Sequence, residues 1–216
     1  MKMLFFLLFA VYAVCSNVSA AIYEDSLVMY LQFESEQNGV SFDSSNYENN
    51  STSHGASLVS DGRIGNAYSL DYADSLSVAD STSLNIQTNS VTISTWFQPY
   101  VDIADMPSAY PILLIKRPWL QGGYAAHFIK SSGRIIMQYC SDGGSSHAES
   151  TTAFRQNTWY HYTGILDNNT LRVYINGNLQ GTASANLPIG SSAGVDMTIG
   201  SNFKGKLMML LCGIVL

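Results

Sequence analysis

Residues 159–182 limit most strongly what this chain can fold into. Residues 159–166 alternate in character, and the Asp-Asn-Asn at 167–169 is typical of a turn before a second alternating run at 171–175. The Asn-Gly pair at 176–177 follows at once. Both residues tolerate positive φ, so the pair suits a type I′ turn that returns the chain as a third strand. Three consecutive antiparallel strands are therefore predicted.

The rest of the chain has the same character. It is rich in Ser, Thr, Tyr and Gly, is punctuated by Asn-Gly, Asp-Gly and Gly-Gly pairs, and has no long run of apolar residues at helical spacing. Short strands at regular intervals indicate a two-sheet sandwich. The predicted strands are 27–33, 67–70, 75–78, 91–98, 111–116, 124–130, 134–139, 159–166, 171–175, 178–183 and 197–199.

The N-terminus indicates the compartment. Lys2 precedes an apolar run, and small residues end a segment at 1–20 that is typical of a signal peptide. The run is shorter than the about 20 apolar residues of a membrane-spanning helix, so we expect a secreted protein without a membrane span. Residues from 21 onward are long enough for one sizeable core, and one domain is predicted.

Charge and residue content limit the classes of partner and the covalent modifications that can be expected. The chain has 10 Lys and Arg against 16 Asp and Glu, and an acidic surface disfavours nucleic acid and anionic membranes. After removal of residues 1–20, Cys140 and Cys212 remain, and the sequence does not decide whether they pair. Asn49, Asn50 and Asn168 each begin an Asn-x-Ser/Thr triplet, which makes them candidate glycosylation sites in a eukaryotic secretory pathway only.

Five motifs along the chain are distinctive together. They are Trp-Tyr-His-Tyr-Thr-Gly at 159–164, Leu-Arg-Val-Tyr-Ile-Asn-Gly at 171–177, Gly-Arg-Ile-Gly-Asn-Ala-Tyr-Ser-Leu-Asp at 62–71, Val-Thr-Ile-Ser-Thr-Trp-Phe-Gln-Pro at 91–99 and Met-Thr-Ile-Gly at 197–200. These motifs resemble those of laminin-G-like domains, which are concanavalin A-like jelly rolls. The resemblance covers residues 27–207, and it implies an all-β, two-sheet antiparallel jelly-roll sandwich over a domain at 21–207.

The resemblance ends after Leu207. Where the family continues with an acidic residue and a closing strand, residues 208–216 form an atypical apolar tail. The interpretation favoured by the sequence is a truncated or frame-shifted gene product that lacks its closing strand. A membrane tail is a second interpretation, although the stretch is about half of a helical span. In the third, the apolar residues themselves supply a strand.

The sequence contains no recognisable catalytic constellation, so we expect a protein that is not an enzyme. Glu34 and Glu36 share one strand face, but the Glu-x-Asp-x-Glu pattern of glycosidases is missing, which favours solvated surface charges. A glycoside-active enzyme remains the alternative if Glu34 or Glu149 faces a second acid. The four histidines lack metal-ligand spacing, and the resemblance gives His161 a structural role.

Calcium is the cofactor that the resemblance implies. The loop at 43–50 is similar to the family's Asp-x-Ser-Gly-Asn-x-Asn-x-Gly loop, and its carboxylate and amide oxygens are of the kind that calcium takes. Asp43 and Asn46 are the predicted ligands. The alternative is that these residues only cap their own backbone turns.

A tryptophan in a loop is the candidate centre of a ligand surface. Trp119 lies between turn residues and can present its ring to a sugar or a partner protein, with Tyr110 and Tyr124 beside it. The alternative is that Trp119 folds back onto the sandwich. Trp96 and Trp159 lie within predicted strands and are expected in the core.

Three function classes follow from these observations. The first is a secreted recognition or adhesion module that binds carbohydrate or an extracellular protein. The second is a glycoside-active enzyme, and the third is a fragment without independent function. The sequence favours the first class and leaves the ligand open.

Overall fold

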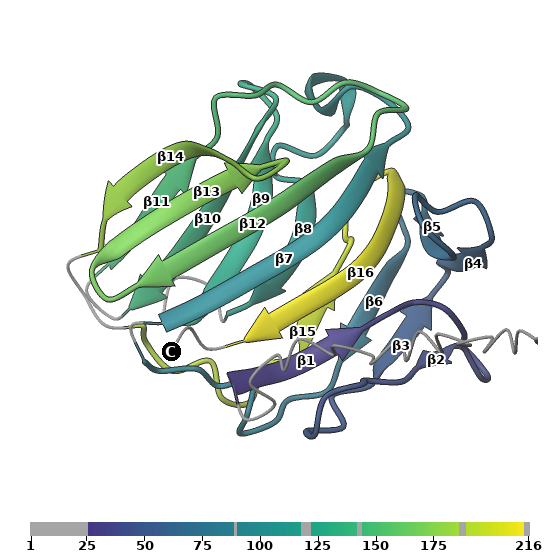
Figure 1. Ribbon diagram of the computed structural model, residues 1–216, viewed down its shortest axis with the longest axis horizontal. Coiled ribbons are helices and arrows are strands. Elements are labelled where there is room, and N and C mark those ends of the chain that lie inside the picture. Colours follow the sequence, from purple (N-terminus) through teal and green to yellow (C-terminus); the bar gives the residue numbers. More distant parts are fainter. Residues whose placement is uncertain (1–25, 89, 118–121, 142–143, 186–188, 214–216) are drawn as a thin grey trace, which may run out of the picture.

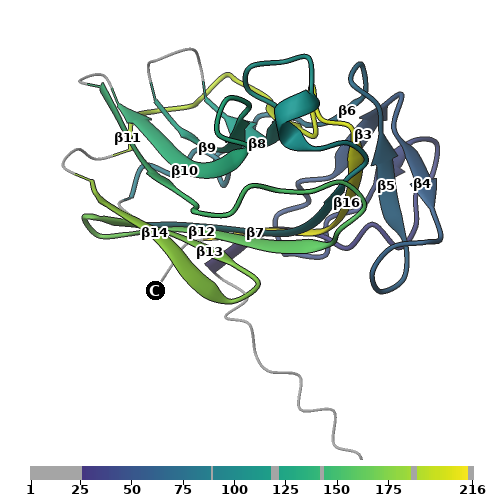
Figure 2. The same ribbon diagram turned by 90° about the horizontal axis from the view of Figure 1, so that it is seen from above.

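The computed structural model describes residues 26–88, 90–117, 122–141, 144–185 and 189–213. Two antiparallel sheets of eight strands each lie face to face (Figures 1 and 2), with a short 3-10 helix at Ile103–Asp105. The prediction of an all-β, two-sheet antiparallel sandwich is therefore confirmed. The predicted signal peptide at 1–20 lies outside the described residues.

Sheet A forms the front layer in Figure 1. Its strand order is β14-β13-β12-β7-β16-β5-β4, and β1 also pairs with β16. The strands are β14 (Asn178–Ser184), β13 (Thr170–Ile175), β12 (Tyr160–Asp167), β7 (Ser90–Pro99), β16 (Gly205–Gly213), β5 (Ala67–Leu70), β4 (Ser57–Val59) and β1 (Leu27–Leu31).

Sheet B forms the layer behind it. Its order is β11-β10-β9-β8-β15-β6-β3-β2. The strands are β11 (Gly144–Glu149), β10 (Arg134–Ser141), β9 (Tyr124–Ile129), β8 (Ile112–Lys116), β15 (Met197–Ile199), β6 (Ser75–Val78), β3 (Ser51–His54) and β2 (Val40–Ser41).

The three consecutive strands predicted at residues 159–182 are present as β12, β13 and β14. β12 pairs with β13 and β13 with β14, all antiparallel. Asn176 and Gly177 have φ values of 50° and 77°, as the type I′ turn requires. Along β7 buried and half-buried residues alternate over the whole strand, so one face of sheet A is turned to the core.

Aromatic side chains from both sheets meet between the layers. The ring of Phe97 on β7 lies 5.2 Å from Phe128 on β9, 5.1 Å from Phe154 and 6.4 Å from Phe203, measured between centroids. All four side chains are buried. These edge-to-face contacts join the sheets through one continuous core.

Residues 208–213 of the apolar tail are part of the fold. Residues 205–213 form β16, which pairs with β7, β5 and β1 in the middle of sheet A. A bulge at Met209, with φ of 48°, shifts the register so that Leu207, Leu210 and Cys212 all face the core. Through Gly213 the closing strand is therefore present, and the expectation that it is missing is wrong. The structure agrees with the third interpretation, in which the apolar residues themselves form the strand.

The two cysteines lie on different sheets. Cys212 is buried on β16, with its Sγ 3.7 Å from the Tyr124 hydroxyl, and Cys140 is buried on β10. Both thiols are free.

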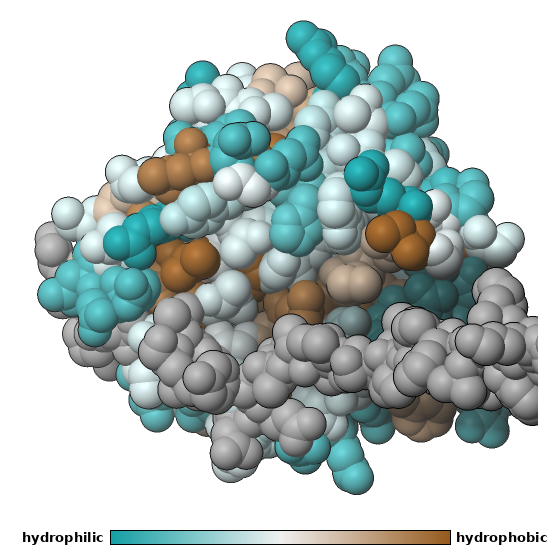
Figure 3. All heavy atoms as spheres, viewed as in Figure 1, coloured by the Kyte–Doolittle hydropathy of each residue, from teal (hydrophilic) through white to brown (hydrophobic). Residues whose placement is uncertain are grey.

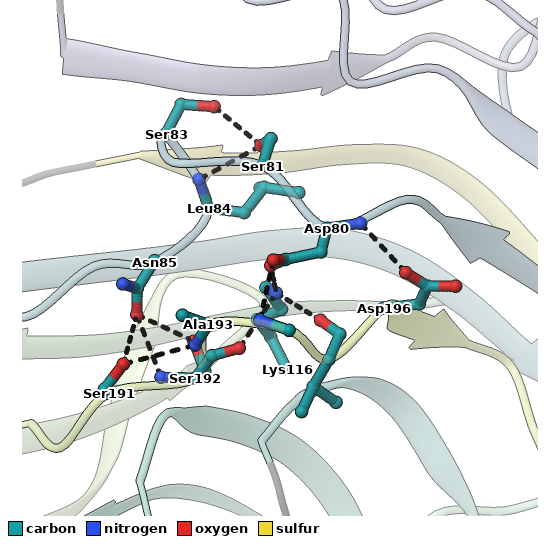
Figure 4. Close-up of polar contacts among 12 residues, drawn as sticks. Asp80, Ser81, Ser83, Leu84, Asn85, Lys116, Ser191, Ser192, Ala193 and Asp196 are labelled. Carbon is teal, nitrogen blue, oxygen red and sulfur yellow. Dashed lines mark hydrogen bonds and ion pairs between the residues drawn. The ribbon is translucent and has the colours of Figure 1, made fainter.

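Lys116 at the end of β8 is fully buried and anchors two loops (Figure 4). Its ammonium group pairs with Asp80 and donates to the carbonyl oxygens of Ser192 and Val195. Asp80 in turn accepts the Gly194 N–H at 2.7 Å. This cluster fixes the position where β8 ends, and Arg117 follows directly.

The outer face of sheet A is mostly polar. Figure 3 shows hydrophobic side chains on this face in separate patches among polar ones. Among the described residues no helix has the length and apolar character to cross a membrane.

Candidate ligand-binding site

The register of sheet B places one row of side chains on its outer face. Ile112 on β8, His127 on β9 and Ile136 on β10 are direct cross-strand neighbours. In the next row Ala125 stands opposite Ile115 on one side and Gln138 on the other. The short side chain of Ala125 leaves room between its larger neighbours.

A pocket of about 390 Å³ opens on this face, which we call the sheet-B pocket. A volume of about 300–1,000 Å³ is usual for small-ligand sites. The pocket joins apolar walls to a few polar groups. It is lined by Tyr110, Ile112, Ile115, Arg117, His127, Ile129, Ile136, Gln138 and His147.

Unpaired polar atoms gather in the sheet-B pocket. Among the described residues, four buried side-chain nitrogen or oxygen atoms have no hydrogen-bond partner. Three belong to its lining: Arg117 Nε, His127 Nδ1 and Gln138 Oε1. A buried polar atom without a partner costs about 1–3 kcal/mol, so such atoms in a pocket indicate that a ligand or water satisfies them.

His127 is the most deeply placed of these groups, with 7% of its surface exposed. Burial, and then the positive charges of Arg117 and His147, lower the pKa of His127 to about 4. The imidazole is therefore neutral near pH 7, with one ring nitrogen that donates and one that accepts.

Sequence reasoning missed this site. His127, Gln138 and His147 are scattered in the sequence, and only the pairing of β9, β10 and β11 brings them together. His127 and Gln138 each stand at an outward position of a strand between apolar residues, which is the one signal that the sequence offered.

Tyr110 is the one predicted ligand-surface residue that the structure places at the pocket. The residue is 57% exposed, and its ring meets that of His127 edge-on, with centroids 5.7 Å apart. It also lines a second hollow of about 340 Å³ with Ala104 and Lys130. Tyr110 therefore stands as an exposed ridge between two hollows.

The other two predicted ligand residues do not join Tyr110. Tyr124 is fully buried and donates its hydroxyl to the Leu84 carbonyl oxygen at 3.0 Å, so the prediction that its ring contacts a ligand is wrong. Its position on β9 turns it to the core, where desolvation raises the pKa of its hydroxyl. Trp119 lies outside the described residues.

Trp96 and Trp159 are half-buried rather than in the core, which corrects a second expectation. With Arg63, His161 and Asn176 they line a pocket of about 420 Å³ on the outer face of sheet A, the sheet-A pocket. The Arg63 guanidinium lies 4.3 Å from the Trp96 ring centre. His161 keeps the predicted structural role, because its Nε2 lies 3.0 Å from Ser94 Oγ and its N–H donates to Asn176.

The predicted calcium loop is organised by Asp43. Its carboxylate accepts the N–H groups of Tyr30, Ser45 and Asn49 at 2.7–2.9 Å and the Ser45 hydroxyl at 2.6 Å. These four donors use the about four acceptor sites of a carboxylate, so Asp43 in this arrangement does not fit a calcium ion. Asn46 is exposed, and the described residues contain no group of three or more His, Cys, Asp or Glu placed for a metal.

The acidic residues weighed for catalysis contact hydrogen-bond donors. Glu34 accepts the Asn66 N–H at 3.1 Å, and Glu36 accepts the Tyr68 hydroxyl at 2.6 Å. Glu149 accepts the Ser132 hydroxyl at 2.9 Å and lies 3.9 Å from Arg134. Each of the three carboxylates therefore has a structural role as a hydrogen-bond acceptor.

The three candidate glycosylation sites differ in accessibility. Asn49 is 4% exposed, and its Nδ2 donates to the Val28 carbonyl and to Ser83 Oγ. A glycan on that nitrogen does not fit this fold, so the prediction for Asn49 is wrong. Asn50 is half-buried, and its Oδ1 accepts the Asp43 N–H. Asn168 is exposed at the β12–β13 turn.

Comparison with known proteins places this geometry among related folds. A family model described as the concanavalin A-like lectin/glucanases superfamily matches residues 70–209. No curated protein matches the sequence. The fold is similar to the binding domain of Paraclostridial Mosquitocidal Protein 1, with 18% identity, a TM-score of 0.71, and coverage of 88% of this chain and 49% of that one.

Two further solved structures were obtained with sugars. Domain 4 of the extracellular arabinanase AbnA from Geobacillus stearothermophilus, in complex with arabinotriose, shares 16% identity at a TM-score of 0.67, over 88% of this chain and 94% of that one. The ligand-binding domain of botulinum neurotoxin serotype D, in complex with N-acetylneuraminic acid, shares 15% identity at a TM-score of 0.68. The match covers 88% of this chain and 48% of that one. The chain spans about half the length of the two toxin chains.

Proposed function

The chain belongs to the concanavalin A-like lectin/glucanase superfamily, and we propose that it is a secreted, non-catalytic module that binds glycans through the sheet-B pocket. The observation that carries this proposal is the convergence on one pocket of Arg117 Nε, His127 Nδ1 and Gln138 Oε1, which are buried and have no hydrogen-bond partner among the described residues. Secretion rests on the signal-peptide pattern at residues 1–20.

The chemistry of the pocket suits a sugar. A sugar hydroxyl both donates and accepts hydrogen bonds. Arg117 Nε is a donor, Gln138 Oε1 is an acceptor, and the neutral His127 ring offers either. The isoleucines provide an apolar wall for the C–H face of a sugar ring.

Tyr110 extends the surface beyond a single sugar. Its exposed ring can stack on a sugar while its body separates the two hollows. A chain of sugars laid across Tyr110 reaches both hollows. The similar fold that was solved with arabinotriose supports an oligosaccharide as the ligand.

Binding to an array of oligosaccharides tests the proposal. We expect the secreted protein to bind a defined subset, and Tyr110→Ala to lower the affinity at least tenfold. Phe42→Ala is the matched control, because Phe42 is a similarly exposed aromatic residue (53%) outside the pocket lining. Failure of the wild-type protein to bind any glycan, or an equal loss in both variants, would contradict the proposal.

A further inference from the structure

Arg117 brings a positive charge into the sheet-B pocket that no carboxylate of the described residues compensates. Among the described residues six cationic side chains form ion pairs with Asp or Glu, and Arg117 is not one of them. Within the described part of the chain, its Nη1 donates only to Cys140 Sγ, at 3.3 Å, and its buried Nε has no partner. Sulfur is a weak acceptor, so the guanidinium leaves most of its donors unused.

The groups that the structure describes around Arg117 do not supply a negative charge. His127 and His147 are the other titratable bases of the lining, and Tyr110 and Gln138 are its neutral polar members. Glu149, the carboxylate on the neighbouring strand β11, is held by Ser132 and Arg134. The described lining therefore contains basic groups and no acid.

We propose that the glycan bound in the sheet-B pocket is acidic, with its carboxylate or sulfate paired to the Arg117 guanidinium. This inference rests on the proposed function of the same pocket. A partly buried cation without a partner is unfavourable, and an anionic group restores both its charge balance and its unused hydrogen bonds. The planar guanidinium presents two parallel N–H donors to such a group.

The site differs from a general basic surface. The chain as a whole carries a net charge of −6, so long-range attraction does not favour anions. Recognition must come from contact inside the pocket. We therefore expect selectivity for a glycan that places its anionic group beside a ring that fits the isoleucine wall.

Matched pairs of glycans test the inference. The array carries each sialylated or uronic-acid oligosaccharide beside its carboxyl-reduced form, and each sulfated one beside its desulfated form. Titration calorimetry then measures the affinity of the protein for both members of the pair that binds best. We expect the anionic member to bind at least tenfold more tightly, and Arg117→Gln to abolish that preference. The carboxylate and sulfate pairs show which anion is preferred.

Two outcomes separate this inference from the proposed function. If neutral and anionic members bind equally and Tyr110→Ala weakens both, glycan binding stands and the acidic ligand is wrong. If no member binds, both proposals fall. Arg63→Gln is the control, because Arg63 forms no ion pair with any described residue and lines the sheet-A pocket, so this variant should keep the preference. The melting temperature of each variant checks its folding.

Discussion

Lys116, fully buried at the end of β8, forms an ion pair with Asp80, whose side chain is 31% exposed. The loss of one partner therefore has a different energetic cost for Lys116 than for Asp80. Without Asp80, the ammonium group stays buried with carbonyl oxygens alone, whereas without Lys116 the Asp80 carboxylate still reaches water.

Removal of Asp80 should accordingly destabilise the protein more than removal of Lys116. Loss of one partner of a buried pair costs about 3–5 kcal/mol, so we expect Asp80→Ala to lower the free energy of unfolding by about 3 kcal/mol. Lys116→Met should cost about 1 kcal/mol, because it removes the charge and keeps the apolar stem. Urea unfolding measures both. Equal losses would contradict this reading.

The pH dependence of the same pair has a defined sign. The hydrogen bond from Lys116, and then that from the Gly194 N–H, lower the pKa of Asp80. The contribution is therefore present above the carboxyl's unfolded pKa and is lost as the pH falls through the lowered folded value. Unfolding curves of the wild-type protein and Asp80→Ala should converge in acid. Curves that stay parallel would contradict the assignment.

The lowered pKa of His127 should make the protein less stable at mildly acidic pH. Its pKa is about 4 in the folded protein against 6.5 for the free side chain. The unfolded chain binds the proton more readily, so stability is full above pH 6.5 and falls by about 3 kcal/mol toward pH 4. His127→Gln keeps a neutral polar group and should flatten the unfolding free energy in this window. An unchanged slope would show that His127 is not buried as described.

Calcium should not stabilise the loop at 43–50. Because Asp43 already accepts four hydrogen bonds, we expect the melting temperature to be the same with calcium and with chelator. Asp43→Asn, which replaces one acceptor oxygen by a donor, should lower it by several degrees. A calcium-dependent rise in the wild-type protein would restore the metal site that the sequence predicts.

Glycosylation should discriminate among the three candidate asparagines. Expressed in a eukaryotic secretory host, the folded protein should carry a glycan at Asn168, which is exposed, and none at Asn49, whose Nδ2 is buried and donates two hydrogen bonds. Peptide mass spectrometry measures the occupancy. A folded product modified at Asn49 would be inconsistent with this structure.

Most of the fold was predictable from local signals. The turn at Asn176-Gly177 and the alternation in β7 and β12 are properties of short segments, and strands such as 67–70, 75–78 and 197–199 have the predicted bounds. β3 and β11 were missed, because their Ser- and His-containing sequences lack apolar alternation and are held by pairing with neighbours. β16 was misread because its apolar residues differ from the closing strand of the family that the sequence resembles, although such residues suit a pleated strand.

The site was less predictable than the fold. Tyr110 was identified because it is an aromatic residue near a predicted loop. That Arg117, His127 and Gln138 line one pocket depends on the order and register of β8, β9 and β10. Tyr124 and Trp96 were assigned to the wrong environments, because a strand's alternation does not reveal which of its two faces is turned to the core.

The nitrogen resonances of the histidine rings test the central claim most directly. The protein is titrated with the glycan that binds best on the array, while His127 Nδ1 and His161 Nε2 are followed by NMR. We predict a saturable shift of His127 Nδ1 and no shift of His161 Nε2, which lies in the sheet-A pocket. A shift confined to His161 would place the ligand on the opposite face of the sandwich and would contradict the account.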